Sequence, residues 1–291
     1  MSSPSSPVVP RIAVAGATGR VGAALTVALA DSPVRVRALT RDPAAADFPA
    51  SIEIRAVDFD DAASLRSALE GIERLFISHG TSPRQVANEI ALIDAAVASG
   101  VRHIVKLSVL GPPSRRHPAD WHMEIEAHLA TQSVGYTVLR PGPFADILRR
   151  AAAAVSRGAW SGAAGNGTVN FIDTRDVADV ARVALLDGDL DAQRAYHLTG
   201  SKAWSMAEIA QELSALLGRP VTYSHRTPAE HRAALIAAGA NDFVADLMLG
   251  IDRAFRDSAF AEYSTTVEQL TGHAPRPLTH WLRENIALFR A

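Results

Sequence analysis

The chain has 291 residues, of which 48% are apolar and 21% charged, and its formal net charge is −2. This composition is typical of a globular protein with a large core, and the charge argues against sequence-independent nucleic-acid binding, which needs a basic surface. Cysteine is absent, which excludes disulfides, thiolate metal sites and thiol nucleophiles. The longest uncharged apolar stretch, Val21 to Ala30, has about half the length of a membrane span.

The first ten residues are rich in Ser and Pro and contain no basic residue. We interpret residues 1–10 as a disordered tail rather than a secretion signal. A cytoplasmic protein without a membrane partner is therefore expected.

Short β-type runs alternate with helical patterns through the first half of the chain. The expected strands are residues 11–15, 34–39, 52–57, 73–77, 102–107 and 136–140, and the expected helices are residues 20–31, 61–69, 85–99 and 121–131. Such alternation predicts βαβ units and a parallel sheet with helices on both faces. The predicted fold is therefore α/β, a doubly wound Rossmann sheet.

The second half changes character. Residues 158–167 are expected to form a loop, residues 169–172 and 195–198 strands, and residues 174–186 a helix; from residue 205 onward the pattern is mostly helical, with a strand-like piece at 220–223. We divide the chain into the tail 1–10, a dinucleotide-binding domain 11–157 completed by about 169–198, and a smaller C-terminal substrate lobe 199–291. Ligands are expected beyond the carboxyl ends of the strands, shared between sheet and lobe.

The strongest motif follows the first strand and opens the first helix: Ala15-Gly16-Ala17-Thr18-Gly19-Arg20-Val21-Gly22. Gly16 allows a sharp turn, Gly19 lets backbone N–H groups approach a pyrophosphate, and Gly22 lets the helix pack close to the sheet. The helix N-terminus adds a favourable dipole, and Thr18 and Arg20 add side-chain donors. The loop predicts a dinucleotide site that includes Gly16, Thr18, Gly19, Arg20, Val21 and Gly22.

The end of the second strand indicates the type of cofactor. An acid is expected there in NAD-binding proteins, but this chain has Arg41, whose guanidinium suits a 2′-phosphate and favours NADP(H). The alternative is that Asp42 holds the ribose, which would favour NAD. Asp58 and Phe59, after the third strand, are candidates to flank the adenine, although Asp58 could instead cap the following helix.

Together with this loop and Thr40-Arg41-Asp42-Pro43, three further blocks carry a family resemblance. They are residues 93–108 (IDAAVASGVRHIVKLS), residues 122–126 followed by 136–144 (YTVLRPGPF), and residues 196–200 (YHLTG). From Arg11 to about Leu288 the chain resembles the NmrA-like family, an atypical branch of the short-chain dehydrogenase/reductases that includes quinone oxidoreductases and triphenylmethane-dye reductases. The resemblance implies an NADP-binding sheet and a variable substrate lobe. It also implies that Ser78, His79 and Gly80 lie beside the nicotinamide ribose and that Pro141 and Phe144 line the nicotinamide.

Typical short-chain reductases use a Tyr-x-x-x-Lys pair, which this chain lacks, because its tyrosines are followed four residues later by Arg140, Gly200, Thr227 and Val267. The corresponding helix carries His122 and Glu126, one turn apart. Three readings stay open: an acid in which Glu126 orients His122 and raises its pKa, a metal pair without an obvious third ligand, and a surface ion pair. Ser108 is a candidate substrate hydrogen-bond donor.

The two lysines are Lys106 and Lys202. Lys106 is a site candidate if its strand phase directs it there. In the second half, Trp160, Phe171, Trp204 and Phe243 could form core or wall a pocket for an aromatic substrate.

We predict an NADPH-dependent reductase that transfers hydride to a small conjugated or quinone-like acceptor. Such an acceptor with a delocalised charge does not need a strong protein acid. The alternatives are a non-catalytic NADP-sensing regulator and a non-redox enzyme such as a cyclase or dehydratase. The expected partner is a small, aromatic or conjugated molecule; no metal is expected, and an oligomer is compatible with the sequence.

Overall fold

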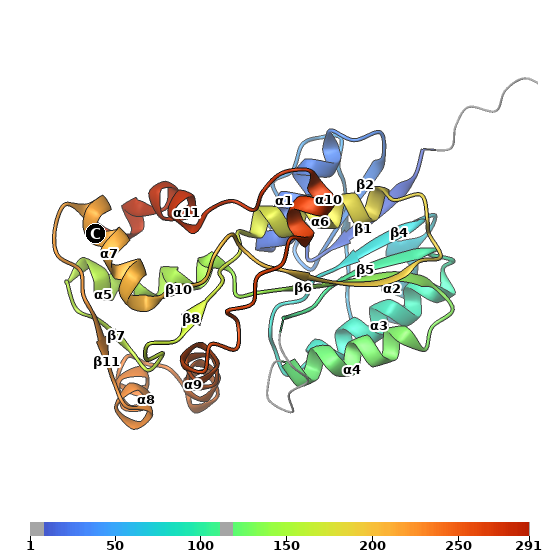
Figure 1. The fold of residues 1–291 in the computed structure, drawn as a ribbon. Coiled ribbons are helices and arrows are strands. Elements are labelled where there is room, and N and C mark those ends of the chain that lie inside the picture. Colours follow the sequence, from blue (N-terminus) through green and yellow to red (C-terminus); the bar gives the residue numbers. More distant parts are fainter. Residues whose placement is uncertain (1–8, 111–118, 291) are drawn as a thin grey trace, which may run out of the picture. The chain divides into compact units, whose positions relative to one another are not determined.

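The structure is a computed structural model that describes residues 9–110 and 119–290 (Figure 1). The expected disordered tail therefore lies, except for its last two residues, outside the described residues. The chain divides into two compact units: Met1–Ser108, Asp120–Arg140 and Val177–Tyr196 form the first, and Val109–Ala119, Pro141–Asp176 and His197–Ala291 form the second. Residues 141–157 belong to the second unit, whereas the sequence analysis placed them in the dinucleotide-binding domain.

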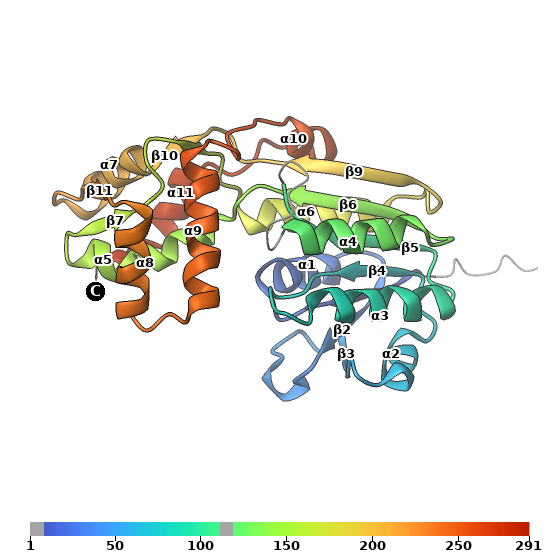
Figure 2. The same ribbon diagram turned by 90° about the horizontal axis from the view of Figure 1, so that it is seen from below.

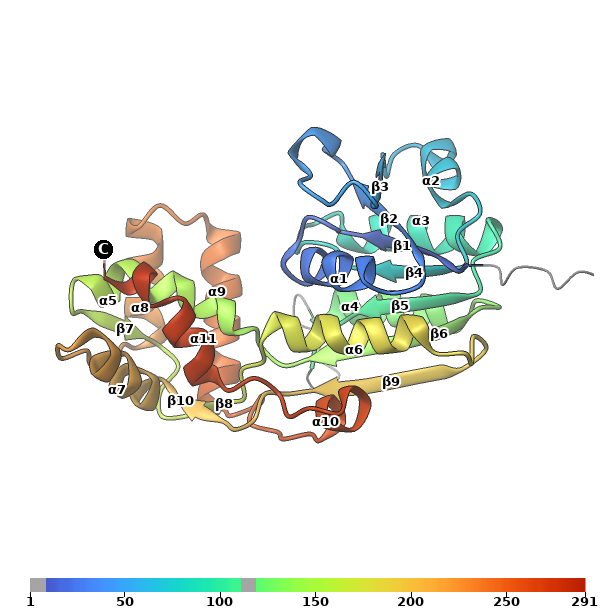
Figure 3. The same ribbon diagram turned by 90° about the horizontal axis from the view of Figure 1, so that it is seen from above.

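The first unit is built on a seven-stranded sheet with the strand order β3-β2-β1-β4-β5-β6-β9. The strands are β1 (Arg11–Ala15), β2 (Arg35–Thr40), β3 (Glu53–Ala56), β4 (Arg74–Ile77), β5 (His103–Leu107), β6 (Gly135–Pro141) and β9 (Gln193–Leu198). The neighbours from β3 to β6 pair in parallel, and Figure 3 shows β9 running in the direction of β6. The order reverses between β1 and β4, which confirms the predicted doubly wound fold.

Helices cover both faces of this sheet. They are α1 (Arg20–Ala30), α2 (Ala62–Leu69), α3 (Gln85–Ala98), α4 (Ala119–Ala130) and α6 (Thr174–Leu186), with a short 3-10 helix at Pro43–Ala45. Figure 1 shows α3 and α4 on one face and α1 and α6 on the other. Because both faces are covered, the central strands are almost continuously apolar, as in Ile12–Ala15 and Leu75–Ile77, whose side chains are all buried.

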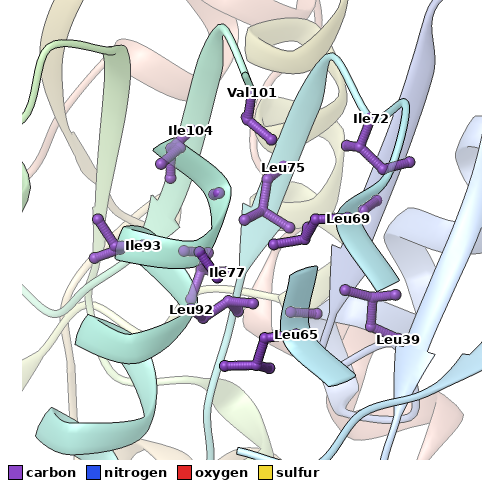
Figure 4. Close-up of a cluster of buried hydrophobic side chains, with 14 of the residues drawn as sticks. Leu39, Leu65, Leu69, Ile72, Leu75, Ile77, Leu92, Ile93, Val101 and Ile104 are labelled. Atoms are coloured by element: carbon purple, nitrogen blue, oxygen red, sulfur yellow. The ribbon is translucent and has the colours of Figure 1, made fainter. Parts of the chain in front are cut away.

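The core beneath α2, α3 and α4 contains alternate residues of the strands (Figure 4). Leu75, Ile77 and Ile104 point from the sheet toward Leu65 of α2 and Leu92 of α3. Each such side chain contributes roughly 1.5–3 kcal/mol on full burial. Since strand side chains alternate, Lys106 shares the face of Ile104, and it therefore points into this helix layer.

The second unit is mostly helical, with two small sheets. Its elements are a 3-10 helix at Ala145–Ala151, α5 (Ala152–Ser156), β7 (Trp160–Gly162), β8 (Thr168–Val169), β10 (Trp204–Ser205), α7 (Met206–Leu217), β11 (Tyr223–His225), α8 (Pro228–Ala237), α9 (Asp242–Arg256), α10 (Thr266–Thr271), α11 (Leu278–Glu284) and a 3-10 helix at Ile286–Phe289. The strand expected at 169–172 is the shorter β8, and the piece expected at 220–223 forms β11 three residues later. Trp160, Phe171 and Trp204 lie in this unit's core, whereas Phe243 is 42% exposed.

Candidate cofactor and active site

The glycine loop has the backbone geometry that its sequence predicts. Gly16 has a φ of +74°, and a Cβ there would lie 2.3 Å from the carbonyl oxygen of Ser78. A Cβ on Gly22 would lie 2.1 Å from the carbonyl oxygen of Gly16. Both positions therefore require glycine, the first for its left-handed turn and the second for the close approach of helix and loop.

The N-terminus of α1 remains open to a ligand. Gly19 is its N-cap and supplies no side-chain hydrogen bond to the first turn. Thr18, Gly19 and Arg20 are exposed, while Val21 is buried and anchors the helix to the sheet. The N–H groups of the first helical turn and the helix dipole at this position fit a pyrophosphate.

Arg41, Asp58 and Phe59 line one hollow of about 420 Å³ beyond the ends of β2 and β3, which Asn88 of α3 also lines. The Asp58 carboxylate accepts the N–H of Asp60 at 2.9 Å. The cap of α2 is Asp61, whose carboxylate accepts the N–H of Ala63 at 2.8 Å. The helix-cap alternative for Asp58 is therefore wrong.

His79, after β4, contacts two residues that line this hollow, Asn88 and Phe59. Its Nδ1 lies 2.6 Å from the carbonyl oxygen of Gly80 and its Nε2 lies 3.0 Å from the amide nitrogen of Asn88. Nδ1–H therefore donates to the carbonyl, and Nε2 accepts from the amide. The ring also meets Phe59 edge to face, with 5.5 Å between the ring centroids. Ser78 precedes it at the end of β4 and is half-buried.

The expected pairing of His122 with Glu126 is wrong. Both residues lie on α4, but His122 Nδ1 is 3.1 Å from Lys106 Nζ and its Nε2 is 3.3 Å from the side-chain nitrogen of Gln85. Burial and the nearby Lys106 ammonium lower the pKa of His122 to about 3. At neutral pH His122 is therefore uncharged, which contradicts the reading in which Glu126 orients His122 and raises its pKa.

Glu126 belongs to a different group of side chains. Its carboxylate accepts the Ser108 hydroxyl proton and binds Arg140 of β6, with 2.6 Å between Arg140 Nη2 and Glu126 Oε2. The hydrogen bond to Glu126 also raises the pKa of Arg140. The structure thus joins Ser108 and Glu126, as two of the three catalytic candidates, but holds them apart from His122.

The Lys106 side chain is buried among protein groups. It is 0% exposed, and Nζ lies 2.8 Å from Glu89 Oε2 and 2.7 Å from the carbonyl oxygen of Leu107, besides its contact with His122. The Leu107 carbonyl oxygen and His122 Nδ1 lie at hydrogen-bond distance from the ammonium group, and Glu89 supplies the opposite charge. The assignment of Lys106 as a cofactor contact therefore stays a prediction.

Gln85, Asn88, Glu89 and Arg140 were missed by the sequence analysis. The first three are buried on α3, beside Leu92 and Ala96. These polar residues are spaced three and four residues apart, in register with the apolar positions. That spacing places polar groups on the buried face of a helix, and it could have indicated a buried polar cluster. Nothing local in the sequence indicates Arg140 as the partner of Glu126.

Pro141 and Phe144, the remaining cofactor candidates, lie in the second unit. Pro141 is buried, and its carbonyl oxygen accepts the N–H of Leu110 at 2.7 Å. Phe144 is half-buried and forms a β-bridge with Ile172. Within residues 9–110 and 119–290, no group of three His, Asp or Glu residues is arranged to hold a metal ion, and no helix is long and apolar enough to cross a membrane.

Known proteins share this architecture and much of the sequence. Quinone oxidoreductase 2 of Escherichia coli (strain K12) is 33% identical over 269 residues, which cover 90% of this chain and 94% of that protein. NAD(P)H azoreductase of Xenophilus azovorans is 32% identical over 285 residues, covering 96% of this chain and 99% of that protein. The crystal structure of the NADPH-dependent quinone oxidoreductase from Escherichia coli in complex with NADPH aligns with a TM-score of 0.84 and 32% identity, over 95% of this chain and 98% of that one.

A family model described as NAD(P)H-binding matches residues 16–188, from the glycine loop to just beyond α6. This match covers more than half of the chain, and the relatives extend it over nearly the whole length. The cofactor is therefore a reduced or oxidised nicotinamide dinucleotide, and the substrate is a small molecule. The protein belongs to the NAD(P)H-binding family, as an oxidoreductase of its NmrA-like, atypical short-chain branch.

Proposed function

We propose that the protein is an NADPH-dependent reductase that transfers hydride to a quinone-like or otherwise conjugated aromatic acceptor. The observation that carries this proposal is the hollow in which Arg41, Asp58 and Phe59 converge. When bound, the cofactor supplies the hydride, and the residues of the first unit bind and orient it. Dependence on a reduced dinucleotide pool is compatible with the expected cytoplasmic location.

Arg41 supports NADPH over NADH. Its guanidinium is exposed in the hollow, and no carboxylate among the described residues pairs with it. A 2′-phosphate would provide that partner through charge-assisted hydrogen bonds. Such bonds contribute roughly 1.5–3 kcal/mol, or about tenfold to a hundredfold in affinity.

The acceptor class follows from the protonation state of the candidate acid. His122 is uncharged at neutral pH and surrounded by Lys106 and Gln85, and the Ser108 proton is held by Glu126. Neither residue is poised as a strong proton donor to an alkoxide. Quinones and cationic or azo dyes fit, because their reduced forms delocalise charge or take a proton from water. The relatives named for quinone and azo reduction support the same class.

The cofactor assignment is tested by Arg41→Gln with Arg35→Gln as the matched control. Both arginines are exposed and flank the same strand, Arg35 beginning β2 and Arg41 following its end, roughly 20 Å away. We expect Arg41→Gln to weaken NADPH binding about tenfold to a hundredfold and NADH binding little. Arg35→Gln should change neither. Equal losses for both cofactors in Arg41→Gln would contradict the 2′-phosphate assignment.

The reaction is tested by following NADPH absorbance with 1,4-naphthoquinone and an azo dye as acceptors. Acceptor-dependent oxidation of NADPH, with a product two hydrogens heavier, is the expected result. Tight NADPH binding without oxidation by either acceptor would contradict the reductase proposal and favour a sensing role. A product of unchanged mass would favour a non-redox reaction.

A further inference from the structure

The second unit contains a hollow of its own, with a volume of about 180 Å³. It lies between α5, β7, β11, α8 and α9, and all of its lining residues belong to this unit. Figure 2 shows α8 and α9 side by side there. The hollow is therefore lined by the second unit alone, and none of its lining residues is a candidate nucleotide contact.

The helices α8 and α9 each line this hollow with one face. Met248, Ile251 and Phe255 of α9 line it with the three- and four-residue spacing of one helix face. From α8 come His231 and Leu235, one turn apart, and none of the ten residues of that helix is fully buried. Protein interiors are normally close-packed, so apolar helix faces around an unfilled space can gain stability from a ligand that fills it.

Aromatic rings form one wall of the hollow. Trp160 of β7 and Tyr223 of β11 meet edge to face, with 5.0 Å between ring centroids and an interplanar angle of 73°. Gly162 allows this arrangement, because a Cβ there would lie 2.7 Å from the Tyr223 hydroxyl oxygen. A flat aromatic ligand fits against such a wall, since aromatic pairs prefer edge-to-face or offset contacts.

The Tyr223 hydroxyl is one of the polar groups of this hollow, which Arg150, Ser161 and His231 also line. The Tyr223 oxygen accepts the N–H of Ala164 at 3.2 Å, and no described residue accepts the proton of its hydroxyl. Burial raises the pKa of Tyr223 to about 12, so the proton is retained at neutral pH. The nearby Asp252 carboxylate is already engaged, by the N–H of Ala163 at 2.8 Å and by His231 at 3.3 Å. The Tyr223 hydroxyl therefore suits a neutral acceptor such as a carbonyl oxygen.

We propose that this hollow binds a neutral, single-ring aromatic carbonyl compound, with its ring against Trp160 and its oxygen accepting a hydrogen bond from Tyr223. The size agrees, because an engineered apolar cavity of about 150 Å³ holds benzene, and the 180 Å³ hollow leaves room for a small substituent. The proposal does not depend on the reduction proposed above, since binding at this site requires neither nucleotide nor turnover.

The test uses two probes of similar shape, acetophenone with a carbonyl oxygen and ethylbenzene without one. Binding to the full chain without nucleotide is measured by calorimetry and by ligand-observed NMR. The wild-type protein should bind both probes. Tyr223→Phe should weaken acetophenone binding by up to about tenfold, the value of one neutral hydrogen bond, and leave ethylbenzene binding unchanged. Equal weakening of both probes would contradict the role of the hydroxyl.

A second pair of variants tests the location. Ala154 lines the hollow, whereas Ala153, the adjacent residue of α5, is exposed and does not. Ala154→Phe should abolish binding of both probes by filling the space, and Ala153→Phe should retain it, with circular dichroism confirming that each variant folds. Ala154→Leu, a smaller filling substitution, provides the same comparison if the phenylalanine variant does not fold. Unchanged binding in a folded filled variant, or no binding to the wild type, would overturn the proposal.

Discussion

The buried ion pair between Lys106 and Glu89 allows a quantitative test of how the first unit is held together. The Lys106 side chain is 0% exposed and that of Glu89 1%, and their charged atoms are 2.8 Å apart. Lys106→Met keeps the length of the side chain and removes its charge. Among the residues that the structure describes, the Glu89 carboxylate would then keep only the hydrogen bond from Gln85, at 2.9 Å. An uncompensated charge of this kind costs about 3–5 kcal/mol.

The only other lysine of the sequence supplies the control. Lys202 is 53% exposed, lies 3.8 Å from Glu208 and sits over the Trp204 ring. Lys202→Met should cost less than about 1 kcal/mol, the range of an exposed ion pair and cation–π contact. Urea unfolding followed by circular dichroism compares the two variants at one pH and protein concentration.

Removing both charges distinguishes a buried ion pair from simple loss of packing. In Lys106→Met combined with Glu89→Leu no unpaired charge remains, so the double variant should be at least about 2 kcal/mol more stable than the sum of the single losses implies. If Lys106→Met costs no more than Lys202→Met, or if the single losses simply add, the reasoning about this pair is refuted.

Two further predictions concern the same unit. The pKa of His122 falls from 6.5 to about 3 on folding, so the stability from its neutral form is fully present above about pH 6.5 and is lost as the pH falls toward 3. Between pH 7 and pH 5 the free energy of unfolding of His122→Gln, measured in urea, should therefore fall by about 2 kcal/mol less than that of the wild type. Equal decreases in the two proteins would contradict the lowered pKa of His122. Gly22→Ala would place a Cβ 2.1 Å from the Gly16 carbonyl oxygen, whereas a Cβ on Gly188 meets nothing within 4 Å. Fluorescence titration should show severely weakened NADPH binding only for Gly22→Ala, and equal effects of the two substitutions would contradict the close-approach role.

Periodicity predicted the parts of the fold that depend on local pattern. Alternating strands and helices were sufficient for the parallel sheet, and the strand–turn–helix context located the glycine loop, because both depend on residues close in sequence. The two small sheets of the second unit could not be predicted from local sequence. β7 pairs with β11 about sixty residues later, and such short strands carry no clear period. Tertiary pairing, rather than propensity, decides their limits.

The candidate site shows the same division between local and distant information. Spacing placed His122 and Glu126 on one helix face, but each side chain is bound by residues of other elements: His122 by Lys106 and Gln85, and Glu126 by Ser108 and Arg140. Two side chains four residues apart on a helix can pair, but a stronger buried partner can bind one of them instead. For that reason burial and Lys106 lower the pKa of His122, whereas pairing with Glu126 would have raised it.

The polar residues of α3 connect these two sets of contacts. Asn88, which lines the hollow of Arg41, Asp58 and Phe59, donates to His79, while its neighbour Glu89 binds Lys106 inside the helix layer. Adjacent positions on a helix point about 100° apart, so Asn88 can line the hollow while Glu89 of the same turn points into the core. The effects of substitution at the two positions should therefore separate. Loss of the Asn88 amide acts on the orientation of the His79 ring and hence on NADPH affinity, whereas loss of the Glu89 charge acts on the free energy of unfolding through Lys106. An α3 that carried only core residues would leave His79 without its second hydrogen bond, and one without Glu89 would leave the Lys106 charge uncompensated.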